Sequence, residues 1–121
     1  MLLNFKMITK NPKSISEEKY QEILDIMPVC CVDLYIQKEN KILLALRKNE
    51  PVKGKFWVPG GRVYKNEKLE EAAIRKAKEE CGLDVKIEKK LGSYDLMFER
   101  SPFEGVKSGS HAINIAFLVS L

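Results

Sequence analysis

The sequence predicts one globular domain of the α+β or mixed α/β class. Strand-like runs rich in β-branched residues surround one strongly amphipathic helical segment, which is the pattern of a sheet packed by a helix. The composition agrees, because 121 residues with 45% hydrophobic and 31% charged content are typical of one ordinary folded domain. The longest apolar runs, such as residues 42–46, are too short to span a membrane, so we expect a soluble, cytoplasmic protein.

The first predicted element is a helix that ends near Ile26. Ser14 and Glu17 have the spacing of a capping box, and Pro28 provides the stop. The apolar positions recur at roughly helical spacing: Ile15, Tyr20, Ile23, Leu24 and Met27.

A β-hairpin is predicted next. Residues 29–36 (VCCVDLYI) and residues 41–47 (KILLALR) are strand-like, and a polar turn at residues 38–40 separates them. Residues 55–61 (KFWVPGG) are predicted to form a short strand that runs into a glycine loop.

The second helix is predicted to start at Asn66 or Glu67 and to end near Cys81, with Gly82 as the left-handed residue beyond it. Residues 85–99 contain one or two further strands. A polar loop follows at residues 100–110, and HAINIAFLVSL, residues 111–121, is expected to be a buried final strand.

Charge and cysteine content exclude several classes of protein. The net charge of +4, from 21 basic and 17 acidic residues, allows an anionic substrate but does not require nucleic acid. Three cysteines fit neither a disulfide framework nor a zinc site, because the adjacent Cys30 and Cys31 point to opposite faces of a strand. We expect reduced, packed thiols.

Two adjacent glutamates at the end of the second helix suggest a site. Steps of 100° per residue place Glu80 inside the apolar arc and Glu79 near its edge. An inward carboxylate is costly unless it is paired or bound to a cation. Two interpretations stay open: ordinary helix pairs with Lys76 and Arg75, or a cation site. The arc itself comprises Leu69, Ala72, Ala73, Ile74, Ala77 and Cys81.

The loop before this helix favours the cation site. Residues 59–62 (PGGR) offer backbone groups without side-chain obstruction, next to Arg62, whose guanidinium suits a phosphate. Oxygen ligands with no nearby pair of Cys or His indicate a hard cation such as Mg²⁺.

These residues carry a family resemblance. GRVYKNEKLEEAAIRKAKEECGL, residues 61–83, is similar to the Nudix box, which implies an α/β fold, an α/β/α sandwich with a mixed central sheet. One position departs, because Lys76 stands where the family has glutamate, and this favours a single ion over a metal cluster. The matching positions are Gly61, Glu67, Arg75, Ala77, Glu79, Glu80, Gly82 and Leu83.

Three longer stretches, residues 27–36, 43–72 and 103–117, resemble GDP-mannose mannosyl hydrolases, a Nudix subfamily that also lacks that glutamate. The resemblance implies a hydrolase that uses Mg²⁺, with Mn²⁺ as an alternative, and acts on a nucleotide sugar. Such an enzyme cuts the sugar C1–O bond with inversion and releases the sugar and a nucleoside diphosphate.

The resemblance also implies roles for single residues. His111 would be the general base, Arg62 and Arg47 would neutralise the departing diphosphate, and Asp33 would contact the sugar. Each residue has a plain structural alternative. His111 could be a half-buried imidazole at a strand end, the arginines could be surface residues, and Asp33 could be an outward charge on an edge strand.

The same resemblance assigns the metal ligands. Glu80 is the principal side-chain ligand of Mg²⁺, the Gly60 carbonyl is a backbone ligand, and Glu79 binds directly or through water. Glu67 and Arg75 form a salt bridge between loop and helix. Trp57, with Phe56, is expected either to line a base pocket or to pack in the core.

Two other functions stay open. One is a nucleoside-diphosphate-X pyrophosphatase that releases a nucleoside monophosphate. The other is a nucleotide-binding module in which Lys76 neutralises the carboxylates. We expect residues 1–13 to be an N-terminal extension and residues 14–121 to be one Nudix domain. The family usually continues into another helix that covers the second face of the sheet, and three alternatives stay open for that face here: the N-terminal helix, a second subunit, or further sequence at an incomplete C-terminal part. A homodimer is favoured, and no nucleic acid or membrane partner is expected.

Overall fold

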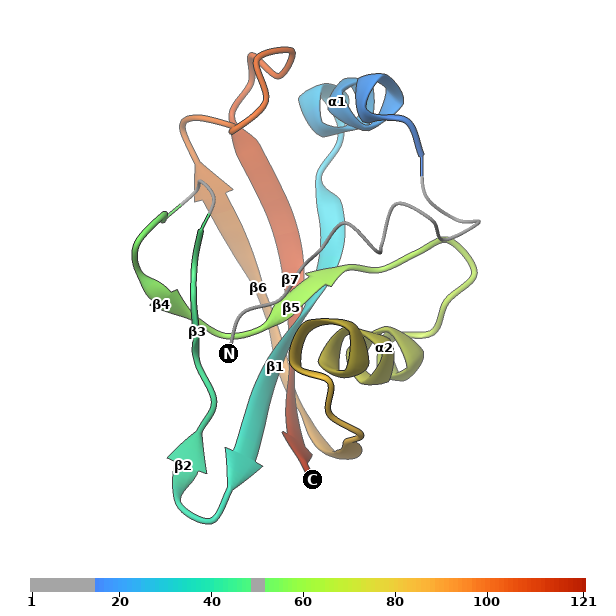
Figure 1. Cartoon of the computed structure of the whole chain (residues 1–121). Coiled ribbons are helices and arrows are strands. Elements are labelled where there is room, and N and C mark those ends of the chain that lie inside the picture. Colours follow the sequence, from blue (N-terminus) through green and yellow to red (C-terminus); the bar gives the residue numbers. More distant parts are fainter. Residues whose placement is uncertain (1–14, 49–51) are drawn as a thin grey trace.

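The structure is a computed structural model that describes residues 15–48 and 52–121 (Figure 1). Two predictions fall outside the described residues: the N-terminal extension at residues 1–13, and Ser14 of the capping box. In chain order the elements are α1 Glu17–Ile26, β1 Val29–Lys38, β2 Lys41–Ile42, β3 Ala45–Leu46, β4 Phe56–Trp57, β5 Gly60–Arg62, α2 Leu69–Cys81, β6 Lys86–Phe98 and β7 Ser110–Ser120.

The described strands form one mixed sheet and one small ribbon. In the main sheet the order is β2-β1-β7-β6, with β5 also paired to β1. β1 runs parallel to β7 and antiparallel to β5, while β6 runs antiparallel to β7. The ribbon pairs β3 with β4. The predicted α/β class with a mixed central sheet is therefore confirmed.

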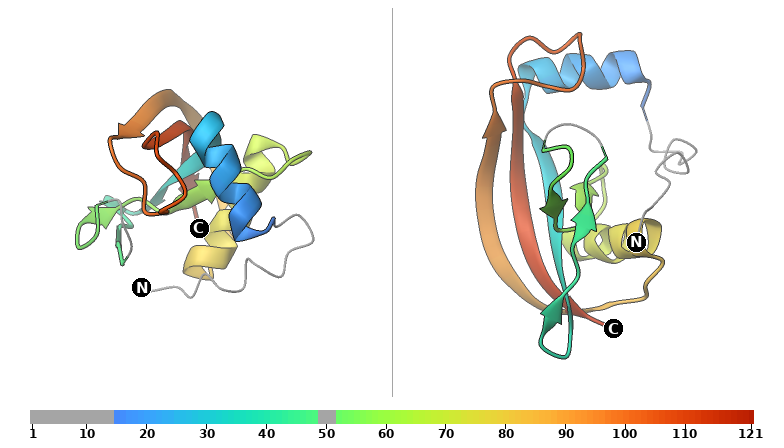
Figure 2. Two further views of the ribbon diagram at one scale, coloured as in Figure 1. Left: turned by 90° about the horizontal axis from the view of Figure 1, so that it is seen from above. Right: turned by 60° about the vertical axis from the view of Figure 1, so that its left-hand side comes forward.

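The two helices take different places. α2 packs on one face of the sheet, whereas α1 lies across the end where β7 begins, next to the loop between β6 and β7 (Figure 2). α1 starts one residue after Ser16, whose hydroxyl accepts a hydrogen bond from the Lys19 amide at 3.2 Å. Ser16 is thus the N-cap. The helix ends at Ile26 as predicted.

The predicted hairpin is confirmed only at its turn. Gln37 pairs with Ile42 and Lys38 with Lys41, but the second arm then breaks, and β3 leaves to pair with β4. The predicted glycine loop was also wrong, because Gly60 lies in strand β5. A side chain there would place its Cβ 2.1 Å from the Val32 carbonyl oxygen, so the missing side chain lets β5 lie against β1.

α2 begins at Leu69, later than predicted. Asn66 has a left-handed φ of 67°, which a helix cannot include, and the Glu67 carboxylate accepts a hydrogen bond from the Tyr64 amide in the preceding turn. The predicted end is confirmed, since Gly82 has φ 66° and its amide bonds carbonyls of the last helical turn.

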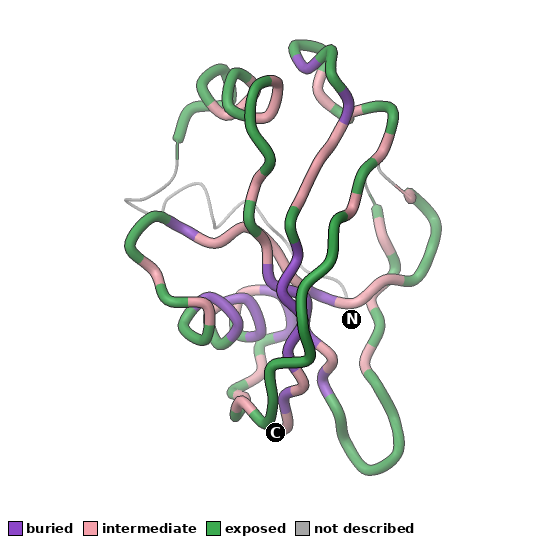
Figure 3. Tube along the Cα trace, turned by 180° about the vertical axis from the view of Figure 1, so that it is seen from behind, coloured by how far each residue is buried: buried purple, intermediate pink, exposed green. Residues whose placement is uncertain are grey.

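The core lies between α2 and the two central strands. Buried stretches gather where α2 meets β1 and β7, while β6 is mostly exposed (Figure 3). Ile74 was wrongly placed in the buried arc, because its side chain is 44% exposed. The final strand is buried, as predicted, only in its second half, because Ile113 is exposed. The core residues are Val32, Leu34, Ile36, Ala72, Ala73, Ala77, Cys81, Ile115, Phe117 and Val119.

The three cysteines, all in the described part, are free thiols. Cys81 is buried and Cys31 is partly buried, but Cys30 is exposed, so the prediction that all three are packed was wrong for Cys30. Burial raises the pKa of the Cys31 thiol to about 12, which keeps it protonated at neutral pH. Within residues 15–48 and 52–121, no helix has the length and apolar character that crossing a membrane requires.

Candidate functional site

A cavity of about 820 Å³ opens at the end of the sheet that α1 crosses. It is large enough for a small organic ligand, because ligand pockets commonly measure about 300–1,000 Å³. Residues from α1, β5, the start of β7 and the connection between β3 and β4 meet in it. Its described lining is Tyr20, Leu24, Val29, Cys31, Arg47, Lys48, Lys53, Gly61, Arg62, Leu96, Phe98, Pro102, Phe103, Ser110, His111 and Ala112.

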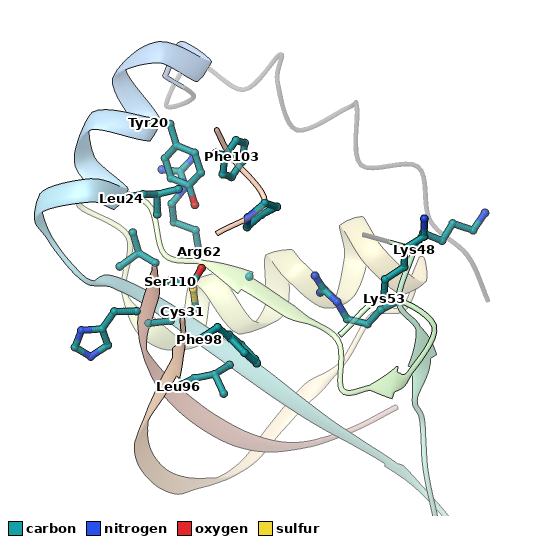
Figure 4. Close-up of a pocket in the computed structure, with 16 residues that line it drawn as sticks. Tyr20, Leu24, Cys31, Lys48, Lys53, Arg62, Leu96, Phe98, Phe103 and Ser110 are labelled. Atoms are coloured by element: carbon teal, nitrogen blue, oxygen red, sulfur yellow. The ribbon is translucent and has the colours of Figure 1, made fainter. Parts of the chain in front are cut away.

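The cavity has an apolar end and a basic end. Figure 4 shows Tyr20, Leu24 and Phe103 together, Phe98 beside Leu96 below them, and Lys48 and Lys53 on the far side. The rings of Tyr20 and Phe103 meet edge to face with centroids 5.9 Å apart. This division of chemistry suits a ligand with an apolar or aromatic part joined to an anionic part.

Arg62 lies among the residues of the apolar end, beside Tyr20 (Figure 4). Its guanidinium stacks over the Tyr20 ring at 5.0 Å and over the Tyr64 ring at 4.9 Å. Its backbone carbonyl accepts a hydrogen bond from Arg75 Nη2 at 2.9 Å. Because contact with two aromatic rings limits the rotamers of the side chain, Arg62 is oriented before any ligand arrives.

Arg75 connects α2 to the segment before it. Its Nε and Nη2 donate to Glu67 at 2.6 and 2.9 Å, and its Nη1 donates to Glu79 at 2.8 Å. The guanidinium also stacks over the Tyr64 ring at 3.8 Å. The predicted Glu67–Arg75 salt bridge is confirmed, and it is bidentate.

Glu80 is buried and paired. Its Oε2 lies 2.9 Å from the Lys76 ammonium, and its Oε1 accepts a hydrogen bond from the Gly60 amide at 3.2 Å. Lys76 also lies 3.6 Å from Glu79 Oε1. The helix pairs that the sequence predicts, Lys76 with Glu80 and Arg75 with Glu79, are therefore both present.

The predicted metal ligands lie together but do not fit a divalent ion as they stand. The Gly60 group that meets Glu80 is the amide rather than the carbonyl, and the Lys76 ammonium contacts both carboxylates. In the part of the chain that the structure describes, no group of three or more His, Cys, Asp or Glu side chains could hold a metal. The assignment of Mg²⁺ to Gly60, Glu79 and Glu80 remains a prediction.

Asp33 is buried in the middle of the sheet. Its carboxylate accepts hydrogen bonds from the Tyr94 hydroxyl and from Asn114 Nδ2, the latter at 3.0 Å. Burial raises the pKa of Asp33, and these two hydrogen bonds oppose the rise. The alternative of an outward charge on an edge strand is wrong, because β1 has strands on both sides. Asp33 is not among the residues that line the cavity.

His111 borders the cavity but faces away from Arg62. Along β1, Cys31 pairs with both Arg62 and Asn114, so those side chains share one side of the sheet. His111 is three residues from Asn114, which places it on the other side. There its Nε2 lies 3.4 Å from Asp95 Oδ1.

The structure therefore assembles only part of the predicted site. Arg47, Arg62 and His111 border one cavity, whereas Trp57 does not, being half-buried in β4. The sequence analysis missed the aromatic lining, since Tyr20, Phe98 and Phe103 come from three separate segments. Only Tyr20 had a signal, its position on the apolar face of the first helix.

The loop over the apolar end is fastened to α1 by Asp25. Its Oδ1 accepts hydrogen bonds from the amides of Lys107 and Ser108 at 2.8 and 3.1 Å, and from the Ser108 hydroxyl at 3.0 Å. These hydrogen bonds lower the pKa of Asp25 below its ordinary value of 3.8, and the bond from the Lys107 amide has the largest effect. The same loop carries Pro102 and Phe103 into the cavity.

We expect Asp25→Asn to destabilise the protein in a manner that depends on pH. Because the folded-state pKa lies below the unfolded value, the carboxylate stabilises the fold above about pH 4 and ceases to do so as pH falls through its folded pKa. Urea denaturation from pH 3 to 7 measures this. The difference between wild type and variant should shrink toward acid pH, and Ser108→Ala, which removes only one of these hydrogen bonds, should lose only part of the pH dependence. A difference that stays constant at every pH would contradict the expectation.

Comparison with known proteins adds three findings. A family model described as NUDIX domain matches residues 27–121. The low-salt glycan biosynthesis protein Agl8 of Haloferax volcanii is 42% identical over 88% of this chain and 68% of its own length. An ADP-ribose pyrophosphatase of Methanocaldococcus jannaschii is 42% identical over 86% of this chain, which spans 56% of that relative.

Solved structures agree on the fold. The crystal structure of a MutT NUDIX hydrolase from Burkholderia pseudomallei superposes with a TM-score of 0.64 at 27% identity, covering 78% of this chain and 68% of that one. A MutT/nudix family protein from Enterococcus faecalis reaches a TM-score of 0.61 at 19% identity, covering 89% and 50% of the two chains. The second likeness concerns the fold alone.

Proposed function

The chain belongs to the NUDIX domain family, and we propose that it hydrolyses a nucleotide sugar similar to GDP-mannose, cutting the sugar C1–O bond and releasing the sugar and a nucleoside diphosphate. The observation that carries the proposal is the two-ended cavity, in which Arg62 lies beside the aromatic side chains and Lys48 and Lys53 lie on the far side. Family members act on substrates linked to a nucleoside diphosphate, and such a substrate has one aromatic end and one doubly charged end.

Different parts of the cavity suit the base and the diphosphate of such a substrate. Tyr20 and Phe103 offer aromatic surface to a base, and Arg47 and Arg62, with the nearby lysines, offer cations to the diphosphate. Guanidinium groups grip phosphates through paired, charge-assisted hydrogen bonds. In C–O cleavage the negative charge develops on the departing diphosphate, which is the part that these cations would face.

The relatives support two versions of the substrate. A glycan biosynthesis relative at 42% identity favours a sugar-linked nucleotide. The ADP-ribose pyrophosphatase at the same identity favours the second candidate, a nucleoside-diphosphate-X pyrophosphatase that attacks phosphorus. Both candidates use the same cavity, and they differ in the bond that breaks.

His111 is the proposed general base for C–O cleavage. An imidazole at the cavity border can accept a proton from water, and the Asp95 carboxylate, whose Oδ1 lies 3.4 Å from the His111 Nε2, can hold the ring in place. Asp33 and Trp57 remain proposed substrate contacts from outside the described cavity lining.

Nudix hydrolases generally use divalent metal ions, typically Mg²⁺. Mg²⁺ dependence is therefore part of the proposal. No step is assigned to an ion on Glu79 and Glu80, since Lys76 contacts both carboxylates.

Product analysis in H₂¹⁸O decides between the candidates. GDP-mannose and ADP-ribose would each be incubated with the protein, with MgCl₂ or with chelator. Free mannose carrying ¹⁸O, together with GDP, is the expected result. Mannose phosphate with GMP would select the pyrophosphatase, and bound nucleotide without turnover would select the nucleotide-binding module; either outcome overturns the proposal.

His111→Ala tests the base in the same assay. We expect kcat to fall by roughly 10²- to 10⁴-fold, the usual contribution of general base catalysis. The matched control is Met97→Ala, which removes the exposed cross-strand partner of His111 and should leave kcat unchanged. Equal activity of the two variants would remove His111 from the mechanism.

A further inference from the structure

A buried lysine lies in the acidic face of α2. The Lys76 side chain is only 6% exposed, and its ammonium lies 2.9 Å from Glu80 Oε2 and 3.6 Å from Glu79 Oε1. A buried ammonium is costly unless carboxylates surround it, so its position is fixed by these two partners. The residue stands at the position where the family motif has glutamate.

The neighbouring strand leaves room for this side chain. A Cβ on Gly61 would lie 2.5 Å from Lys76 Cε and 2.8 Å from Nζ, both closer than atoms can approach. The absent side chain at Gly61 therefore forms the space that the end of Lys76 fills. Gly61 and Lys76 act as a pair, one supplying the space and the other the charge.

The ammonium occupies the place where a cation would bind these carboxylates. Glu80 Oε1 is engaged by the Gly60 amide and Oε2 by Lys76, while Glu79 Oε1 is shared by Arg75 and Lys76. A divalent ion at these carboxylates would meet a fixed positive charge a few ångströms away, in a partly buried site where repulsion is strong.

We propose that the Lys76 ammonium replaces a protein-bound divalent ion at α2. The carboxylates of Glu79 and Glu80 are neutralised by Lys76 from the same helix. The free protein therefore does not bind Mg²⁺ or Mn²⁺ through these two side chains. The inference rests on the proposed function only in treating α2 as part of the reaction site. A divalent ion that the reaction needs would arrive bound to the substrate diphosphate.

Mn²⁺ binding tests the inference without any nucleotide. The full chain is titrated with Mn²⁺, and free ion is followed by electron paramagnetic resonance. We expect no stoichiometric binding by wild type, and Lys76→Glu should tighten binding by roughly 100-fold or more, since a repelling charge becomes a ligand. Lys78→Glu makes the same charge change at an exposed position of α2 and should not create a site.

A second variant removes the ammonium without adding a carboxylate. Lys76→Met keeps an unbranched side chain in the space beside Gly61 but carries no charge, so Mn²⁺ should then bind Glu79 and Glu80 and raise the melting temperature of the variant. The wild-type melting temperature should not respond to Mn²⁺.

Two results would overturn the inference. One is a stoichiometric Mn²⁺ ion bound by wild type and lost in Glu80→Gln. The other is a folded Lys76→Glu variant that binds Mn²⁺ no better than Lys78→Glu. Because these titrations contain no substrate, they are independent of the product analysis, and either proposal can fail without the other.

Discussion

Replacing Arg75 by methionine is expected to lower the free energy of unfolding by about 3–5 kcal/mol, the usual cost of removing one partner from a buried ion pair. The Arg75 and Glu67 side chains are 17% and 8% exposed, so the Glu67 carboxylate would be left with little access to water. Methionine keeps much of the volume of arginine, which separates the loss of charge from the loss of packing. Urea denaturation with linear extrapolation measures the difference.

Two further variants control this result. Arg75→Lys keeps the charge but cannot make the paired hydrogen bonds to Glu67 or stack in the same way over Tyr64, so we expect it to recover only part of the loss. Arg100→Met removes an exposed arginine and should change stability by less than about 0.5 kcal/mol. If Arg75→Met cost no more than Arg100→Met, the Glu67–Arg75–Glu79 network would contribute nothing to the fold.

The parts of this fold that were predicted correctly are those fixed by local chemistry. The end of α2 follows from Gly82, because a residue without Cβ adopts the left-handed conformation at little cost. The turn between β1 and β2 follows from polar residues between two strand-like runs. The Lys76–Glu80 pair follows from i,i+4 spacing alone.

The errors depend on contacts between segments far apart in the chain. Residues 41–47 were predicted to be one strand. In the structure Ala45 and Leu46 instead leave the main sheet and pair with β4, and nothing in residues 41–47 themselves indicates β4 as a partner. The burial of Asp33 could not be predicted, because its two hydrogen-bond partners, Tyr94 and Asn114, come more than 60 residues later. Ile74 fell within a helical arc whose true width is set by how α2 meets the sheet.

The candidate site also has a part that the sequence indicates and a part that only the folded chain assembles. The helix and β5 residues that hold Arg62, Arg75, Lys76 and Glu80 lie within one short stretch of sequence, so motif spacing could indicate them. The cavity is built by α1, β7 and the loop between β6 and β7 closing over β5, and that arrangement appears only in the folded chain. Function inferred from the motif alone therefore omits the surface that would choose the substrate.

Arg62→Ala is expected to weaken GDP binding by roughly 10- to 100-fold, because a hydrogen bond to a charged group contributes about 1.5–3 kcal/mol and 1.4 kcal/mol corresponds to tenfold. The guanidinium is already oriented by Tyr20 and Tyr64, so little side-chain entropy is lost when a diphosphate binds. Isothermal titration calorimetry with GDP measures the change directly and does not depend on which bond the enzyme cuts.

The orientation of Arg62 makes a stronger prediction than its charge. Arg62→Lys keeps the charge, but an ammonium cannot bind a phosphate through two parallel hydrogen bonds or stack on an aromatic ring as a planar guanidinium does. The affinity of this variant for GDP should therefore stay nearer to that of Arg62→Ala than to wild type. Tyr20→Leu keeps an apolar contact yet removes one of the stacked rings, and should weaken GDP binding less than Arg62→Ala does. Arg100→Ala, with the same charge change outside the described cavity lining, should leave the affinity unchanged. If Arg62→Lys bound GDP as tightly as wild type, a simple point charge would be sufficient, and the stacked geometry at β5 would serve the fold rather than the ligand.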